Sequence, residues 1–73
     1  MNDLAAPPCL YVNGEPLAGA EGLTLAGLLA RLGEPPEQVA TALNGSFVPR
    51  DQREGTALAA GDRITVFKAI VGG

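Results

Sequence analysis

The residues of this chain that are best suited to chemistry are its last two, Gly72 and Gly73, which follow a short apolar run. Glycine has no Cβ, so two glycines can enter a narrow slot and leave their N–H and C=O groups free to pair with another protein. A terminal carboxyl group has a pKa of about 3.3–3.7, so at neutral pH it is ionised and can attack an activated phosphate. At this glycine content two terminal glycines arise by chance in roughly one chain in 50. The ending therefore points to a reactive carboxylate without establishing one.

The usual machinery of an enzyme is missing from the rest of the sequence. There is no histidine, so neither a zinc site built on histidine nor a histidine-dependent nucleophile is available. Cys9 is the single cysteine and cannot form an internal disulfide. It has no histidine partner and no basic neighbour in sequence, so we interpret it as a small buried side chain or a bystander and not as a nucleophile. No phosphate-binding glycine loop, paired-cysteine motif or HExxH motif occurs, and the acids are scattered through turns. We therefore expect no catalytic residue and no metal.

The charge pattern excludes some partners. Eight acidic and five basic residues give a net charge of −3, which disfavours nucleic acid because nucleic-acid binding needs a basic face. Residues 1–37 carry five acids and one base (−4), whereas residues 38–73 carry three acids and four bases (+1). The start of the chain lacks a signal peptide, and no apolar stretch approaches the roughly 20 residues of a membrane span. We expect a cytoplasmic protein that binds neither membranes nor nucleic acid.

Three arginines in the second half are candidates for contacting an anion or an acidic partner: Arg50, Arg53 and Arg63. Arg50 and Arg63 would form one basic spot if the loop after Pro49 approached the last strand. The alternative is that all three are scattered surface charges.

The first half of the chain predicts a hairpin followed by a helix. Residues 9–13 alternate as a strand, Asn13 and Gly14 favour a tight turn, and residues 15–19 form a weak partner strand. Thr24 is suited to begin a helix whose apolar face holds Leu25, Leu28, Leu29 and Leu32. Gly33 is suited to end it. Gly27 inside this helix suggests a close approach to the sheet.

The second half predicts another hairpin and a last strand. A strand from Val39 to Leu43, an Asn44-Gly45 turn and a return strand over 46–48 are followed by a polar loop and then an alternating strand over 63–68. We predict an α+β fold in which one helix covers one face of a small mixed sheet, with the first and last strands adjacent at its centre. The predicted organisation is a flexible lead-in over 1–8, a domain over 9–68 and a flexible tail over 69–73.

Three segments carry a resemblance to a known family. "YVNGEPL" is similar to the first hairpin of the ThiS family, the sulfur carriers of thiamine (thiazole) biosynthesis, and "ATALNGSFVPRDQREGTAL" is the most specific match. "AAGDRITVFKAIVGG" resembles the last turn, last strand and Gly-Gly end of that family. The resemblance covers residues 10–73 and implies the β-grasp (ubiquitin-like) fold.

The same resemblance implies a mechanism and partners. A ThiF-type (E1-like) adenylyltransferase would use ATP to adenylate the carboxylate of Gly73, and a persulfide sulfur supplied through a cysteine desulfurase would displace AMP. A ThiG-type thiazole synthase would accept the resulting thiocarboxylate. The chain would then be a monomeric co-substrate with no bound cofactor, not an enzyme. The partner-binding tail would be Ala69, Ile70, Val71 and Gly72. An exposed sheet face near the last strand would dock both partners, with Phe47, Arg50 and Arg63 as candidates. Ile64 and Val66 would join them only if they face outward, and core packing is the favoured interpretation of both.

Two alternatives stay open at this point. The small subunit of molybdopterin synthase (MoaD) ends in the same way, although the "LNGSFVPR" segment is more typical of ThiS. A ubiquitin-like protein modifier or a plain interaction module is the other alternative. Lys68 is the single lysine of the chain, so branched chains of the ubiquitin type are disfavoured.

Overall fold

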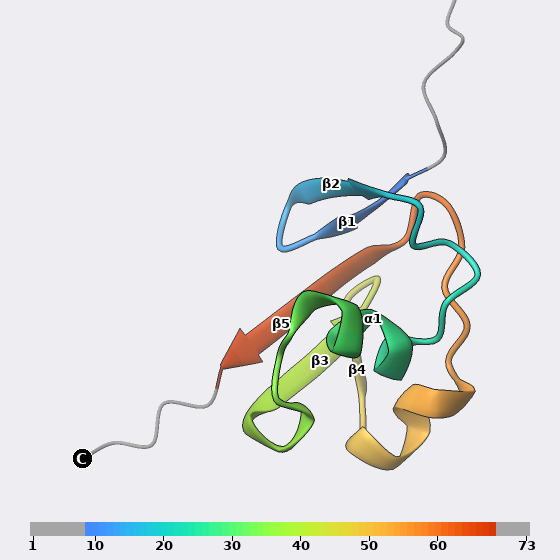
Figure 1. Cartoon of the computed structure of the whole chain (residues 1–73). Coiled ribbons are helices and arrows are strands. Elements are labelled where there is room, and N and C mark those ends of the chain that lie inside the picture. Colours follow the sequence, from blue (N-terminus) through green and yellow to red (C-terminus); the bar gives the residue numbers. More distant parts are fainter. Residues whose placement is uncertain (1–8, 69–73) are drawn as a thin grey trace, which may run out of the picture.

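The computed structural model describes residues 9–68, which form five strands, one α-helix and two short 3₁₀ helices (Figure 1). The elements are β1 (Cys9–Val12), β2 (Glu15–Ala18), α1 (Leu25–Leu32), η1 (Pro36–Gln38), β3 (Val39–Leu43), β4 (Ser46–Val48), η2 (Arg50–Gly55) and β5 (Arg63–Lys68). The expected lead-in over 1–8 and tail over 69–73 lie outside the described residues.

The five strands form one mixed sheet in the order β2-β1-β5-β3-β4. β1 and β5 are parallel neighbours at its centre, and every other neighbouring pair is antiparallel. The first and last strands of the domain therefore lie side by side, which confirms the predicted topology and the α+β class.

Both hairpins turn on an Asn-Gly pair. Asn13 and Asn44 each have φ of 52°, and the following glycines have φ of 85° and 86°. Two consecutive positive φ values define the type I′ turn, whose twist matches that of the flanking strands, and asparagine is the non-glycine residue that best tolerates this region. The same local chemistry thus closes the sheet at both hairpins.

Helix α1 begins and ends where its sequence predicts. The Thr24 side chain accepts a hydrogen bond from the Gly27 N–H at 3.1 Å, and Gly33 ends the helix with φ of 75°. Leu25, Leu28 and Leu29 are buried, whereas Leu32 lies at the edge of the apolar face and is 38% exposed.

The explanation offered for Gly27 is wrong. The atoms nearest to a Cβ built at this position would be Oγ1 of Thr24 at 3.4 Å and side-chain atoms of Leu23 at 3.8 Å. Both residues precede the helix, so no close approach to the sheet requires glycine here.

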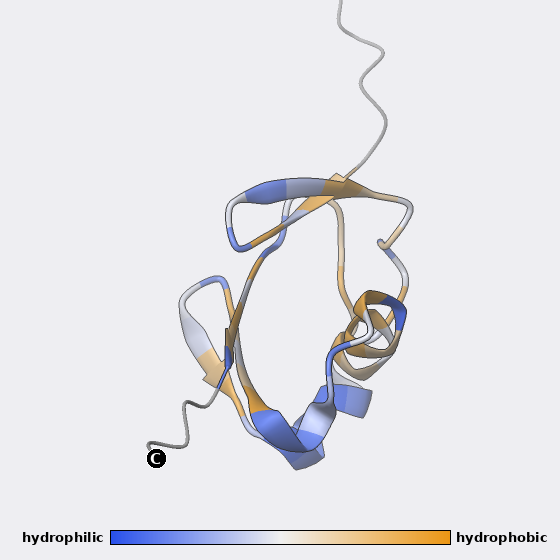
Figure 2. Cartoon of the chain, turned by 60° about the vertical axis from the view of Figure 1, so that its left-hand side comes forward, coloured by the Kyte–Doolittle hydropathy of each residue, from blue (hydrophilic) through white to orange (hydrophobic). Residues whose placement is uncertain are grey.

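The hydrophobic core lies between α1 and one face of the sheet. Figure 2 shows the mostly apolar helix on one side of the sheet only. The core cluster consists of Leu10, Ala20, Leu25, Leu28, Val48, Leu58 and Ile64. Because one helix covers one face, the opposite face of β3, β4 and β5 has no covering element among residues 9–68.

The predicted polar loop after Pro49 is a 3₁₀ helix, η2, followed by an irregular segment. Its sequence, RDQREG, has no apolar residue and therefore no periodicity from which a helix could be predicted. The helix packs beside α1 instead of hanging in solvent, and Leu58 just after it enters the core.

Candidate functional site

The predicted tail residues, Ala69, Ile70, Val71, Gly72 and Gly73, lie outside the described residues, but the structure shows the strand from which they leave. β5 is paired with β3 from the Ile64–Leu43 pair to its end at the Lys68–Val39 pair. On its other side β5 is paired with β1 only as far as the Ile64–Val12 pair. We call the last three residues of β5, 66–68, the tail root.

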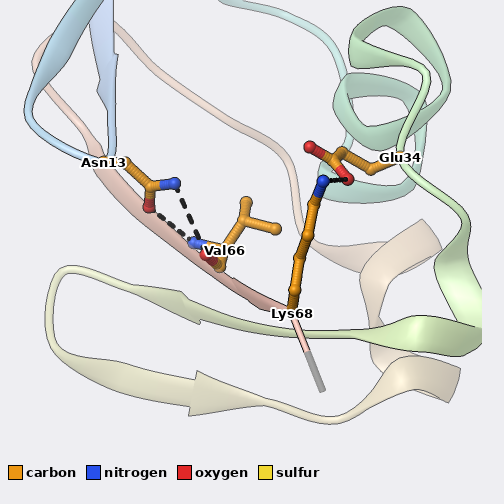
Figure 3. Close-up of polar contacts among 4 residues, drawn as sticks. All are labelled: Asn13, Glu34, Val66 and Lys68. Carbon is orange, nitrogen blue, oxygen red and sulfur yellow. Dashed lines mark hydrogen bonds and ion pairs between the residues drawn. The ribbon is translucent and has the colours of Figure 1, made fainter. Parts of the chain in front are cut away.

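Two side-chain contacts hold the tail root (Figure 3). The Asn13 Oδ1 accepts a hydrogen bond from the Val66 N–H at 2.8 Å, and the Asn13 amide nitrogen donates to the Val66 carbonyl at 3.4 Å. The Lys68 ammonium lies 3.5 Å from the Glu34 carboxylate, just beyond the end of α1. The root is therefore tied to the first hairpin on its edge and to the helix side of the domain by its lysine.

The face of the sheet without the helix carries an apolar strip beside this root. Residues directly opposite each other in neighbouring strands point to the same face, so the pairs Ala42–Phe47, Ala42–Thr65 and Ala40–Phe67 share one face. Phe47 is 67% exposed and Phe67 is 53% exposed. We call these five residues the outer strip: Ala40, Ala42, Phe47, Thr65 and Phe67.

The composition of the outer strip suits it to contact another protein. Two phenyl rings stand on either side of the alanines of β3, which leaves a shallow apolar surface between them. Exposed aromatic side chains are enriched at protein interfaces and rare elsewhere on a small surface. Phe67 belongs to β5 itself and lies directly before Lys68, so the strip reaches the tail root.

The other proposed docking residues fall on the opposite face. Ile64 is buried in the core at 1% exposure, and Val66 packs against the core from the same side of β5. Ile64 and Val66 are therefore core residues, which is the interpretation that the sequence favours. Of the three apolar candidates only Phe47 faces outward.

Arg50 and Arg63 do not form one basic spot. The chain leaves β4 after Val48, which pairs with Thr41, and Thr41 in turn pairs with Val66 near the end of β5. Arg63 begins β5 at the other end, with its guanidinium 5.3 Å from the centre of the Tyr11 ring. Arg63 shares the outer face with Phe47, whereas Arg50 lines a pocket of about 740 Å³ on the helix side.

The interpretation of Arg53 as a surface charge is wrong, because its side chain is only 3% exposed. Its guanidinium donates to Thr41 Oγ1 at 3.1 Å, to the Pro36 carbonyl at 2.9 Å and to the Val39 carbonyl at 2.6 Å. Burial, and to a smaller extent the positive charge of Arg50, lowers the pKa of Arg53. Arg53 is therefore a structural residue that joins η2, η1 and β3.

Two of these roles were missed by reasoning from the sequence. Phe67 could have been found, because Arg63, Thr65 and Phe67 alternate on one face of a strand. The side-chain role of Asn13 could not, because its partner Val66 lies 53 residues later and only the folded topology brings the two together.

Neither a metal cluster nor a membrane-spanning helix is found among the described residues. Within 9–68 no three histidine, cysteine, aspartate or glutamate side chains lie close enough to hold a metal ion. None of the helices in this part of the chain has the length and apolar character to cross a membrane.

The chain resembles one family over nearly its whole length. The family model described as the ThiS family matches residues 10–73. The thiazole synthase of Magnetococcus marinus is 41% identical over 64 residues, which are 88% of this chain and 20% of that protein. The chain thus spans about a fifth of the length of this curated relative.

Solved structures of similar proteins have the same fold. The crystal structure of the thiamine biosynthesis protein ThiS from Geobacter metallireducens has a TM-score of 0.75 and 34% identity, covering 89% of this chain and 99% of that one. The NMR solution structure of a thiamine biosynthesis protein from the same organism has a TM-score of 0.71 and 35% identity, covering 89% and 86% of the two chains.

Proposed function

The chain belongs to the ThiS family and has its β-grasp fold, and from this membership we propose that it is a sulfur carrier in thiamine biosynthesis that holds the sulfur on the carboxyl group of Gly73. The observation that carries the proposal is that the family match extends through the two final glycines and is not confined to the folded core. In this proposal the protein is consumed and regenerated as a co-substrate, and the catalytic groups belong to its partners.

The proposed loading of sulfur onto Gly73 takes three steps. The Gly73 carboxylate attacks the α-phosphate of ATP bound by a ThiF-type adenylyltransferase, forming an acyl-adenylate and releasing pyrophosphate. The terminal sulfur of a protein persulfide, supplied through a cysteine desulfurase, then attacks the acyl carbon and displaces AMP, leaving an acyl disulfide. A thiol cleaves that sulfur–sulfur bond. This releases the thiocarboxylate and leaves a disulfide between the attacking thiol and the cysteine that carried the persulfide.

The proposed acceptor of the sulfur is a ThiG-type thiazole synthase. The similarity to a fifth of the Magnetococcus marinus thiazole synthase supports this partner, because a segment similar to this chain is part of that protein. Two glycines would let the tail enter the narrow active site of that partner, since neither presents a side chain.

The outer strip is the proposed docking surface for both partners. It supplies the exposed aromatic anchors that the core side lacks, and it lies next to the strand that leads into the tail. Phe47 and Phe67 would bury their rings against the partner, while Arg63 at the start of β5 would lie on its polar rim. Arg50 is left out of this surface because it lines the helix side.

The proposed function is tested by deleting Gly72 and Gly73. The truncated chain is expected to fail to restore growth of a thiamine auxotroph that lacks its own carrier, because no carboxylate then reaches the activating enzyme. Deleting Asn2 and Asp3 is the matched control, since these residues also lie outside the described part of the chain, and this variant should restore growth. Growth with the variant that lacks the glycines would refute the carrier role.

The molybdopterin alternative is separated by binding. The chain is expected to bind thiazole synthase and not the large subunit of molybdopterin synthase. The reverse preference would assign it to molybdopterin synthesis.

A further inference from the structure

Asn13 combines a turn residue with a side chain that completes a strand. Its φ of 52° places it in the type I′ turn, where its backbone N–H still donates to the Ile64 carbonyl at 2.9 Å. One residue further along β5, the peptide pairing with β1 has ended. A primary amide carries the same C=O and N–H pair as a peptide bond, and the Asn13 side chain presents both to Val66.

The result is that β5 remains held on its β1 edge to within two residues of the end of the described chain. Without the amide, the Val66 N–H and C=O would have no partner on that edge among residues 9–68. The 2.8 Å bond from the Val66 N–H is the stronger of the two contacts, and the 3.4 Å bond to the Val66 carbonyl is long. The amide therefore fixes mainly the position of the Val66 N–H, and together with the pairing to β3 on the other edge it sets the direction in which β5 ends.

The ion pair at Lys68 cannot do this alone. The Lys68 side chain is 72% exposed, and Glu34 is 24% exposed. Exposed pairs of this kind are weak, because solvent screens them and long side chains lose entropy when they are held. A flexible lysine stem also holds a charge and not the backbone, so it does not fix the β1 edge of the strand.

We propose that Asn13 is a positioning residue for the reactive carboxylate: by bonding both backbone groups of Val66 it orients the tail root so that Gly73 reaches the active site of the activating enzyme when the outer strip is docked. This inference rests on the proposed carrier function. Asn13 touches neither substrate nor partner in this account. It acts through β5, and its loss changes the fraction of docked complexes in which the carboxylate is in place.

The chain supplies its own control in the second Asn-Gly turn. Asn44 has the same φ of 52° and also makes two side-chain hydrogen bonds next to β5. Its Oδ1 accepts from the Arg63 N–H at 2.9 Å, and its amide nitrogen donates to the Asp62 carboxylate at 3.1 Å. N13G and N44G therefore remove equivalent side chains from equivalent turns, one at the tail end of β5 and the other at its beginning.

The experiment measures thiocarboxylate formation by the activating enzyme, with ATP and a persulfide donor, at varied carrier concentration. N13G is expected to lower kcat about tenfold, the loss of two ordinary hydrogen bonds, while KM changes less than about twofold because the outer strip is intact. N44G and E34Q, which removes the ion pair at the same root, are expected to keep kcat within about twofold of the native chain. N13D, which can still accept from the Val66 N–H, is expected to recover part of the lost kcat.

Amide hydrogen exchange at Val66 gives a readout that does not depend on activity. N13G should speed exchange at Val66, and N44G should leave it unchanged. If the native chain forms thiocarboxylate but N13G and N44G have the same kcat, the role of Asn13 is refuted and the carrier function still stands. Failure of the native chain to form any thiocarboxylate would overturn the carrier function instead.

Discussion

At the scale of single residues, two arginines of the same 3₁₀ helix lie in opposite environments. Arg50 and Arg53 both belong to η2, yet Arg50 is exposed whereas Arg53 is buried and bonds three oxygen atoms of the fold. Burying a cation is costly unless its donors are satisfied, and here neutral oxygens satisfy three of them.

Because burial lowers the pKa of Arg53 below its usual value, the unfolded chain holds that proton more tightly than the folded chain does. Stability from this group would therefore rise only as the pH climbs through the folded pKa, in strongly alkaline solution.

Substitution of Arg53 by lysine is expected to lower the free energy of unfolding by about 2 kcal/mol, because an ammonium group cannot reproduce the planar fork that bonds Thr41, Pro36 and Val39. R50K on the same 3₁₀ helix should change it by less than about 0.5 kcal/mol. Urea unfolding measures both variants, and equal losses would show that the Arg53 contacts contribute nothing particular.

The outer strip makes its own prediction at this scale. F67A is expected to raise KM for the activating enzyme about tenfold, because a half-exposed ring can be buried against the partner. Its stability should change little, since the ring is 53% exposed in the free protein. L32A removes an exposed apolar side chain from the helix side and should leave KM unchanged. An unchanged KM for F67A would place docking elsewhere.

At the scale of elements, the sequence predicts the features that depend on neighbouring residues along the chain. The cap at Thr24, the stop at Gly33 and both Asn-Gly turns depend on neighbours within four residues, and all are found as predicted. The helix η2 and the burial of Arg53 depend on Thr41 and Val39 of strand β3, so nothing within RDQREG indicates them. The expected meeting of Arg50 and Arg63 failed for the same reason, because strand register separates them.

Gly27 inside α1 and Gly33 directly after it make a paired prediction. G27A should raise the free energy of unfolding by about 0.5–1 kcal/mol, because alanine favours the helix and its Cβ would only touch Thr24 Oγ1 at 3.4 Å. G33A should lower it by about 1 kcal/mol, because φ of 75° is strained for alanine. Thermal unfolding of both variants checks the signs, and a destabilising G27A would mean that the close contact at Thr24 decides.

At the scale of the whole molecule, the fold separates the core from the surface that we propose for docking. The helix and the core occupy one face of the sheet, and the outer strip and the tail root occupy the other face and one end of its central strand. A 73-residue chain has little stability to spare, and this division leaves the side chains proposed for docking outside the core. Because β5 lies at the centre of the sheet between β1 and β3, the strand that precedes the Gly-Gly end is paired on both sides.

Intact-protein mass spectrometry shows whether the carboxylate of Gly73 carries sulfur. After incubation with the cognate adenylyltransferase, ATP and a persulfide donor, the chain should gain about 16 Da, the difference between oxygen and sulfur, and fragmentation should place the gain on Gly73. Omitting ATP should abolish the shift. An unchanged mass with the complete mixture, or a gain located at any other residue, would contradict the account.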